Sequence, residues 1–93
     1  MSRPLEGVIY LIHLDGKLAH SRHYIGWAHT GRLDARLEHH ARGTGSRFMA
    51  AVREAGIGWH VARTWTGDRY LERRLKNRHG AGRFCPECKK EVA

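Results

Sequence analysis

The sequence predicts an α+β domain, a three-stranded antiparallel sheet flanked by helices in the order β-β-α-α-β-α. Two apolar, strand-like runs within residues 8–28 are separated by a turn signal. Apolar residues then recur at helical spacing, and residues 59–66 alternate before a last helical segment. A chain of 93 residues holds one modest core that buries roughly 60–65% of the unfolded surface, so a single domain over 1–93 is expected.

A β-hairpin is expected first. Val, Ile, Tyr and Leu dominate residues 8–14, Asp15-Gly16 signals a turn, and residues 23–28 supply the second strand. A register that pairs Tyr10 with Tyr24 sends both phenols to one face of the sheet. A slip by one residue would send them to opposite faces.

Two helices follow the hairpin. Thr30 and Ser46 suit the N-cap positions, because their hydroxyls can accept hydrogen bonds from the free N–H groups, and Gly43 and Gly56 are placed to end the helices. Between these ends the apolar positions are Leu33, Leu37 and Ala41, then Phe48, Ala51, Val52 and Ala55. The other face of the first helix is basic and carries Arg32, Arg36 and His40.

A third strand and a last helix complete the predicted fold. Residues 59–66 alternate with a period of two, which puts on one face Trp59, Val61, Arg63 and Trp65. Asp68 suits the N-cap of a helix that runs to about Arg78, with Leu71 and Leu75 facing inward.

Charge points to a polyanionic partner. The chain has 17 Lys and Arg against 9 Asp and Glu, a net charge of +8 with His neutral. Such a field favours nucleic acid, although ribosome-associated and membrane-surface proteins share it. No apolar run approaches the ~18 residues of a membrane helix and no secretory signal is evident, so a cytoplasmic protein without membrane contact is expected.

Two short strings carry a family resemblance. Val8-Ile9-Tyr10 and Tyr24-Ile25-Gly26 resemble the paired signature of the GIY-YIG nucleases. That family's phosphate-binding arginine, accessory histidine and metal-binding carboxylate have counterparts in the same order at Arg36, His40 and Glu72. The resemblance covers about Gly7–Arg78 and leaves a tail over 79–93. It implies the same order of strands and helices, and a metal-dependent endonuclease that hydrolyses DNA phosphodiester bonds.

Hydrolysis of a phosphodiester needs a base for water and positive charge on the phosphate oxygens. Arg36 offers a planar fork matched to phosphate and shares a helical face with His40, although a solvated basic face is the alternative. The resemblance makes one of Tyr10 and Tyr24 a phosphate ligand and the other a ligand or proton acceptor. Ionising Tyr10 at neutral pH costs roughly 4 kcal/mol, whereas a histidine needs almost no help, so Tyr10 and His40 are joint candidates for the base.

Glu72 is the expected metal ligand. A single hard carboxylate suits Mg²⁺ or Mn²⁺, which keep most of their waters and bind substrate phosphate. An exposed ion pair with Lys76 or Arg69 is the alternative. Many family members place an asparagine about a dozen residues later, where this chain has none, and Asn77 is the nearest candidate.

Further arginines are expected to contact DNA phosphates, namely Arg32, Arg42, Arg47, Arg73 and Arg74. No spare helix or ribbon is evident for reading base edges. The resemblance to small members of the family implies that specificity comes from a targeting partner, an oligomer or the shape of the substrate. The sequence leaves the oligomeric state open, and the choice between DNA and RNA.

The tail contains half of a zinc site in Cys85 and Cys88, and nearby His79 offers a third ligand. Inert thiols and a redox dithiol are the alternatives. Two other functional classes compete with the nuclease: a non-catalytic nucleic-acid-binding module of the same fold, and a zinc-stabilised interaction domain. Convergence of the five candidate catalytic groups on one surface would favour the nuclease over the binding module.

Overall fold

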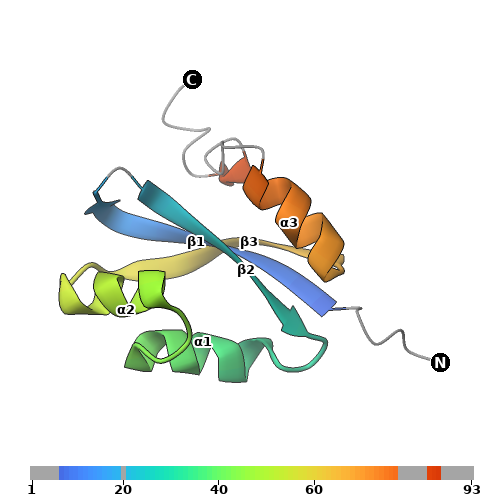
Figure 1. Ribbon diagram of the computed structural model, residues 1–93, viewed down its shortest axis with the longest axis horizontal. Helices are drawn as coiled ribbons and strands as arrows, with labels where there is room; N and C mark the ends of the chain where they lie inside the picture. Colours follow the sequence, from blue (N-terminus) through green and yellow to red (C-terminus); the bar gives the residue numbers. More distant parts are fainter. Residues whose placement is uncertain (1–6, 20, 78–83, 87–93) are drawn as a thin grey trace.

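The computed structural model describes residues 7–19, 21–77 and 84–86. The elements are β1 (Gly7–Leu18), β2 (Ser21–His29), α1 (Leu33–Arg42), α2 (Arg47–Glu54), β3 (Trp59–Gly67) and α3 (Arg69–Asn77). The three strands form one antiparallel sheet in the order β2-β1-β3, which confirms the α+β prediction. Figure 1 shows α1 and α2 on one side of the strands and α3 on the other.

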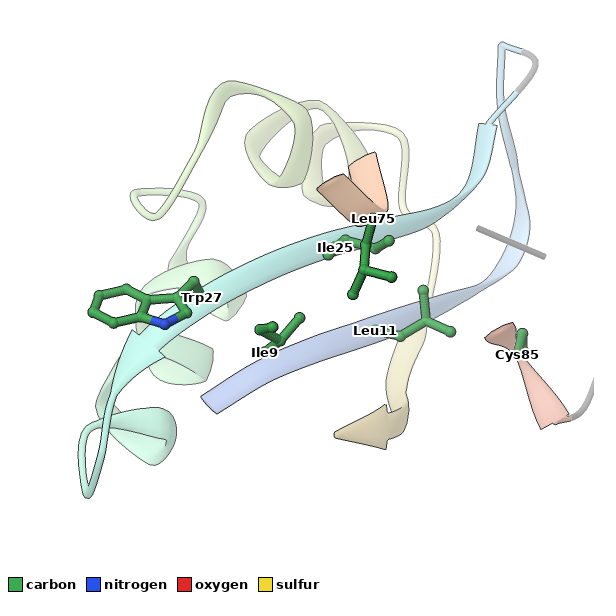
Figure 2. Packing of buried hydrophobic residues seen from close by; sticks show 6 residues of the cluster. All are labelled: Ile9, Leu11, Ile25, Trp27, Leu75 and Cys85. Atoms are coloured by element: carbon green, nitrogen blue, oxygen red, sulfur yellow. The ribbon is translucent and has the colours of Figure 1, made fainter. Parts of the chain in front are cut away.

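The central strand β1 supplies both cores, because its alternate side chains leave opposite faces of the sheet. Ile9 and Leu11 pack toward α3, where they meet Leu75. Figure 2 shows Leu75 pointing toward Ile25 and Leu11, with Cys85 beyond Leu11. The opposite face packs against α1 and α2, and its fully or nearly buried apolar members are Tyr10, Ile12, Leu14, Ala28, Met49 and Val52.

The hairpin is longer than the sequence predicts. Asp15-Gly16 lies within β1 and does not form the turn. The backbone N–H of Asp15 donates to the carbonyl oxygen of Gly58, 2.8 Å away, and this bond holds the chain extended beside the segment that leads into β3. The chain turns only after Leu18, where Ala19 has a positive φ of 55°.

The register of the hairpin also differs from the expected one, by two residues. Tyr10 lies opposite Gly26, and Tyr24 lies opposite Ile12. A shift of two residues preserves the face of every side chain. Tyr10 and Tyr24 therefore share the face covered by α1 and α2, as predicted.

Strand β3 contains a bulge that the alternating pattern did not predict. Leu11 pairs with Arg63 and the next residue, Ile12, pairs with Val61, so Ala62 is an extra residue. The bulge reverses the faces along β3. Val61 packs on the side of α1 and α2, whereas Trp65 packs on the side of α3.

Four of the five predicted helix signals are found at the helix ends, among them Gly56, which follows the C-cap of α2 with φ 71°. The side chain of Ser46 accepts from the N–H of Met49 at 3.1 Å, and that of Asp68 accepts from the N–H of Leu71 at 2.9 Å. Gly43 ends α1 in the left-handed conformation, with φ 80°. The expected Thr30 cap is wrong, because the N-cap of α1 is Arg32, without a side-chain cap. No helix in the described part of the chain combines the length and apolar character needed to cross a bilayer.

Candidate functional site

A buried pair of polar side chains, Tyr10 and His40, lies at the centre of the candidate site. The hydroxyl of Tyr10 and Nε2 of His40 are 2.6 Å apart and share a hydrogen bond. Tyr10 comes from the middle of β1 and His40 from the last turn of α1, and both have 0% exposed surface. Local sequence places each residue on its element, and the packing of α1 against the sheet brings them together.

Two glycines make room for this pair. A side chain at Gly26, the partner of Tyr10 across the strands, would overlap the Tyr10 ring. A side chain at Gly45 would overlap the imidazole of His40. The glycine of Tyr24-Ile25-Gly26 therefore accommodates the tyrosine of the first string, and the two strings meet in a direct contact.

Burial sets the protonation of the pair. Burial raises the pKa of Tyr10 to about 12, against the nearby Arg36 side chain, which lowers it. Burial and then the charge of Arg36 lower the pKa of His40 to about 4. At neutral pH Tyr10 thus keeps its proton and His40 is uncharged, so both groups are harder to ionise than the sequence alone suggests.

Arg36 and Tyr24 adjoin the pair and are both half-buried. Arg36 lies one turn before His40 on α1, and its Nε is buried without a hydrogen-bond partner among the described residues. The rings of Tyr24 and His40 pack edge to face, with their centroids 5.4 Å apart. Tyr24 also stacks on Phe48 from α2, at 5.5 Å and 13°. Tyr24 therefore packs directly against the buried pair while keeping part of its surface exposed.

Glu72 comes from α3, the helix on the other side of the sheet. Contacts between α3 and β2 bring its polar face to the edge of the sheet, where Nζ of Lys76 lies 5.5 Å from the centre of the Tyr24 ring. Glu72 is near enough to contribute to the raised pKa of Tyr10. Its carboxylate lies 3.3 Å from Nζ of Lys76 and its side chain is 17% exposed. Glu72 thus approaches the group of Tyr10, Tyr24, Arg36 and His40 from the helix on the other side of the sheet.

A basic cleft of about 320 Å³ opens beside this cluster. It lies where the end of β2, the start of α1 and the start of α3 meet. Its charged and titratable lining residues are Arg32, Arg36, Arg69, His29 and His39. Arg36 belongs to both the cluster and the cleft. A carboxylate is not among the lining residues, so the cleft suits an anion such as phosphate.

Arg69, His29 and His39 were not predicted to line a site. Arg69 is the first residue of α3, and its guanidinium lies 4.8 Å from the centre of the Trp27 ring. The packing of α3 beside β2 is what brings Arg69 to the cleft, and no local sequence signal reveals that packing. His39 is exposed and lines the cleft.

The other predicted DNA-contacting arginines are exposed but spread over several elements. Arg42 makes a 2.6 Å ion pair with Glu38 on the same helix, which neutralises it. Exposed guanidiniums without such a described pair lie at the start of α2 and along α3, at Arg47, Arg73 and Arg74. Asn77 ends α3, and its side chain lies outside the described residues, so its expected role is untested.

A second cluster, of histidine and cysteine, lies on the other face of the sheet. One donor atom each from His13, His23 and Cys85 falls within 4.8 Å of the others, an arrangement that could hold a metal ion. The zinc prediction from the sequence paired Cys85 with Cys88 and His79. Both of those residues lie outside the described residues, and the described neighbours of Cys85 are instead the two histidines from the hairpin.

Comparisons of the chain with protein-family models, with curated proteins and with solved structures gave no significant match in any of the three. The likeness to the nuclease signature therefore rests on the residues of this chain and on the geometry described above. Any assignment of function has to be argued from that geometry.

Proposed function

We propose that this chain is a cytoplasmic, metal-dependent endonuclease that hydrolyses DNA phosphodiester bonds. The observation that supports the proposal is the hydrogen bond between Tyr10 and His40, with Tyr24, Arg36 and Glu72 in its neighbourhood and a cleft lined by arginine beside it. These residue types supply positive charge, a hard oxygen ligand and a proton acceptor, which are the groups that phosphodiester hydrolysis requires.

Arg36 is the proposed phosphate ligand at the reacting centre. Among the described residues that line the cleft, it is the one close enough to Tyr10 to lower the pKa of the phenol. Arg32 and Arg69, which also line the cleft, hold the neighbouring phosphates of the same strand.

The two candidate bases act together in this proposal. Forming free tyrosinate at pH 7 from a pKa of about 12 costs about 7 kcal/mol. Protonating His40 at pH 7 from a pKa of about 4 costs about 4 kcal/mol. A relay is therefore the cheaper route: Tyr10 takes a proton from the attacking water while its own proton passes to Nε2 of His40, 2.6 Å away.

Glu72 is the proposed ligand of Mg²⁺ or Mn²⁺. The donor chemistry fits, because such ions accept one carboxylate and take their other ligands from water and substrate phosphate. The bound ion would offset the developing negative charge on the phosphate. In the structure the carboxylate of Glu72 is paired with Lys76, so the metal ion has to displace the lysine. Ion pairs near the surface contribute little stability, so this displacement costs little.

One observation favours a second candidate, the non-catalytic nucleic-acid-binding module. Tyr10 and His40 have no exposed surface, as expected of a hydrogen bond that only stabilises the fold. In that case the arginine-lined cleft binds phosphate without cleaving the DNA. Glu72 then serves only to form the ion pair with Lys76.

Cleavage of plasmid and oligonucleotide DNA with Mg²⁺, Mn²⁺ or EDTA tests the proposal. Wild-type protein is expected to cleave only with metal, and Glu72→Gln to lose cleavage by at least about 100-fold. DNA binding by Glu72→Gln should be equal or tighter, because the substitution removes negative charge near the cleft. Duplex binding by the wild type without cleavage in any metal would support the binding module instead.

Glu38→Gln is the matched control for Glu72→Gln. Glu38 also makes an i,i+4 ion pair, with Arg42, but on the exposed face of α1. Cleavage by Glu38→Gln should equal that of the wild type. If Glu72→Gln also cleaves DNA at the wild-type rate, Glu72 is not the metal ligand.

A further inference from the structure

Three histidines form a row across the sheet, on the face away from Tyr10. His13 in β1 pairs with His23 in β2 on one side and with His60 in β3 on the other. Cys85 approaches this row from the C-terminal segment, and its contact with His13 joins residues 72 positions apart in the chain. Both His13 and Cys85 are buried, with 8% and 0% of their surfaces exposed.

We infer that His13, His23 and Cys85 are ligands of a structural zinc ion that fastens the C-terminal segment to the sheet. Three donor atoms point toward one another: Nδ1 of His13, Nε2 of His23 and Sγ of Cys85. Neither the nuclease proposal nor the basic cleft is needed for this inference, since none of the three residues belongs to either.

The spacing of the donors matches a tetrahedral zinc site. Zinc bonds to nitrogen and sulfur set the ligand-to-ligand distances at about 3.3 Å between two nitrogens and about 3.6 Å between nitrogen and sulfur. Nδ1 of His13 lies 3.4 Å from Nε2 of His23 and 3.4 Å from Sγ of Cys85. All three atoms lie within 4.8 Å of one another, so the third edge closes with a small side-chain movement.

The identity of the donors selects the metal. Two imidazoles and a thiolate suit zinc, whereas Mg²⁺ prefers oxygen ligands. Burial of the sulfur keeps it from acting as an exposed nucleophile and is typical of a structural site. The three described donors fill three of the four positions of a tetrahedral zinc ion.

A simple hydrogen bond between thiol and imidazole is the competing explanation for the contact of Cys85 with His13. Nδ1 of His13, however, carries either one hydrogen or one lone pair, and it lies 3.4 Å from both Sγ of Cys85 and Nε2 of His23. A metal ion explains both contacts at once, and it would couple the folding of the hairpin to that of the C-terminal segment.

Metal content and a cobalt spectrum test the inference on the untagged full chain. Protein purified without chelators from zinc-supplemented cells is expected to hold one zinc per chain by mass spectrometry of the metal. Replacement by Co²⁺ should give the thiolate-to-cobalt charge-transfer band and the intense visible bands of tetrahedral cobalt. Wild-type protein that competes for neither metal against a weak chelator would overturn the inference, and this result requires no variant to fold.

Variants identify the ligands. Cys85→Ser is expected to lose the charge-transfer band, and His23→Gln to weaken zinc binding at least tenfold in chelator competition. His60→Gln is the matched control, because His60 belongs to the same row but not to the converging donors, and it should bind zinc as the wild type does. Loss of zinc in His60→Gln with retention in His23→Gln would overturn the ligand set.

Discussion

The hydroxyl of Tyr10 lies 2.6 Å from Nε2 of His40, and this single hydrogen bond joins the central strand to the first helix inside the core. Both residues are fully buried. Without this bond, the Tyr10 hydroxyl and Nε2 of His40 would lose their partner in an apolar environment, which is costly. The bond therefore matters to stability whether or not it also takes part in catalysis, and the two roles can be tested separately.

Tyr10→Phe should destabilise the fold as well as stop cleavage. Loss of the hydroxyl leaves Nε2 of His40 buried without its partner, at a cost of about 1–3 kcal/mol in the free energy of unfolding. Tyr70→Phe is the control, because Tyr70 is 62% exposed and its hydroxyl can be replaced by water. Urea denaturation of the two variants measures the difference. Equal stability of Tyr10→Phe and wild type would mean that the bond contributes nothing to folding.

Gly26→Ala tests the contact between the two signature strings. The new methyl group would overlap the Tyr10 ring, which is enclosed by the core and cannot move away freely, so a loss of about 1–3 kcal/mol is expected. Gly16→Ala is a strand control with no heavy atom near the added group, and it should be neutral or slightly stabilising. Thermal unfolding of both proteins checks the prediction, which fails if the two alanines have the same effect.

Stability should fall on both sides of neutral pH because of the buried pair. The folded state lowers the pKa of His40 from 6.5 to about 4, so below pH 6.5 the unfolded chain binds a proton that the folded chain does not. Up to about 3 kcal/mol is therefore lost as the pH falls from 6.5 to 4. Raising the pKa of Tyr10 to about 12 has the mirror effect, with stability lost between pH 10 and 12.

Urea unfolding at a series of pH values measures this profile. His40→Gln is expected to remove the acid-side contribution while leaving the alkaline one. The difference between wild type and His40→Gln isolates His40 from the seven other histidines of the chain. A difference that does not change between pH 6.5 and 4 would contradict the low pKa.

Local patterns were sufficient to predict the elements, because each rests on neighbouring residues. The caps at Ser46 and Asp68 and the ending at Gly43 depend on hydrogen bonds or backbone conformation within one turn. The bulge at Ala62 could not be predicted in this way. Strict alternation of side chains looks the same with or without an extra residue, and only the pairing of Ile12 with Val61 reveals it.

The candidate site was predictable where one element presents two residues, and not where distant elements meet. Spacing alone puts Arg36 and His40 on one helical face. The place of Arg69 in the cleft depends on how α3 lies against β2, and the contact of Cys85 with His13 joins opposite ends of the chain. These arrangements follow from tertiary packing, which no local pattern encodes.

Duplex binding should depend on salt in a way that identifies the cleft arginines. With about five phosphates contacted, log affinity should fall against log salt with a slope of about −4.5, and each lost contact should weaken that slope by about 0.9. Arg32→Ala and Arg69→Ala are expected to give this change, because both side chains line the cleft. Arg42→Ala should give a smaller one, since Glu38 already neutralises Arg42.

Fluorescence anisotropy with unrelated duplexes over a range of salt measures these slopes. Affinity should differ little between sequences, because the structure described here offers no free helix or ribbon for the major groove. If Arg42→Ala weakened the salt slope as much as Arg69→Ala does, the prediction would fail. The DNA would then contact the outer face of α1 as well as, or in place of, the cleft. Binding that survives high salt and depends on sequence would instead require base contacts, and would contradict a phosphate-dominated interface.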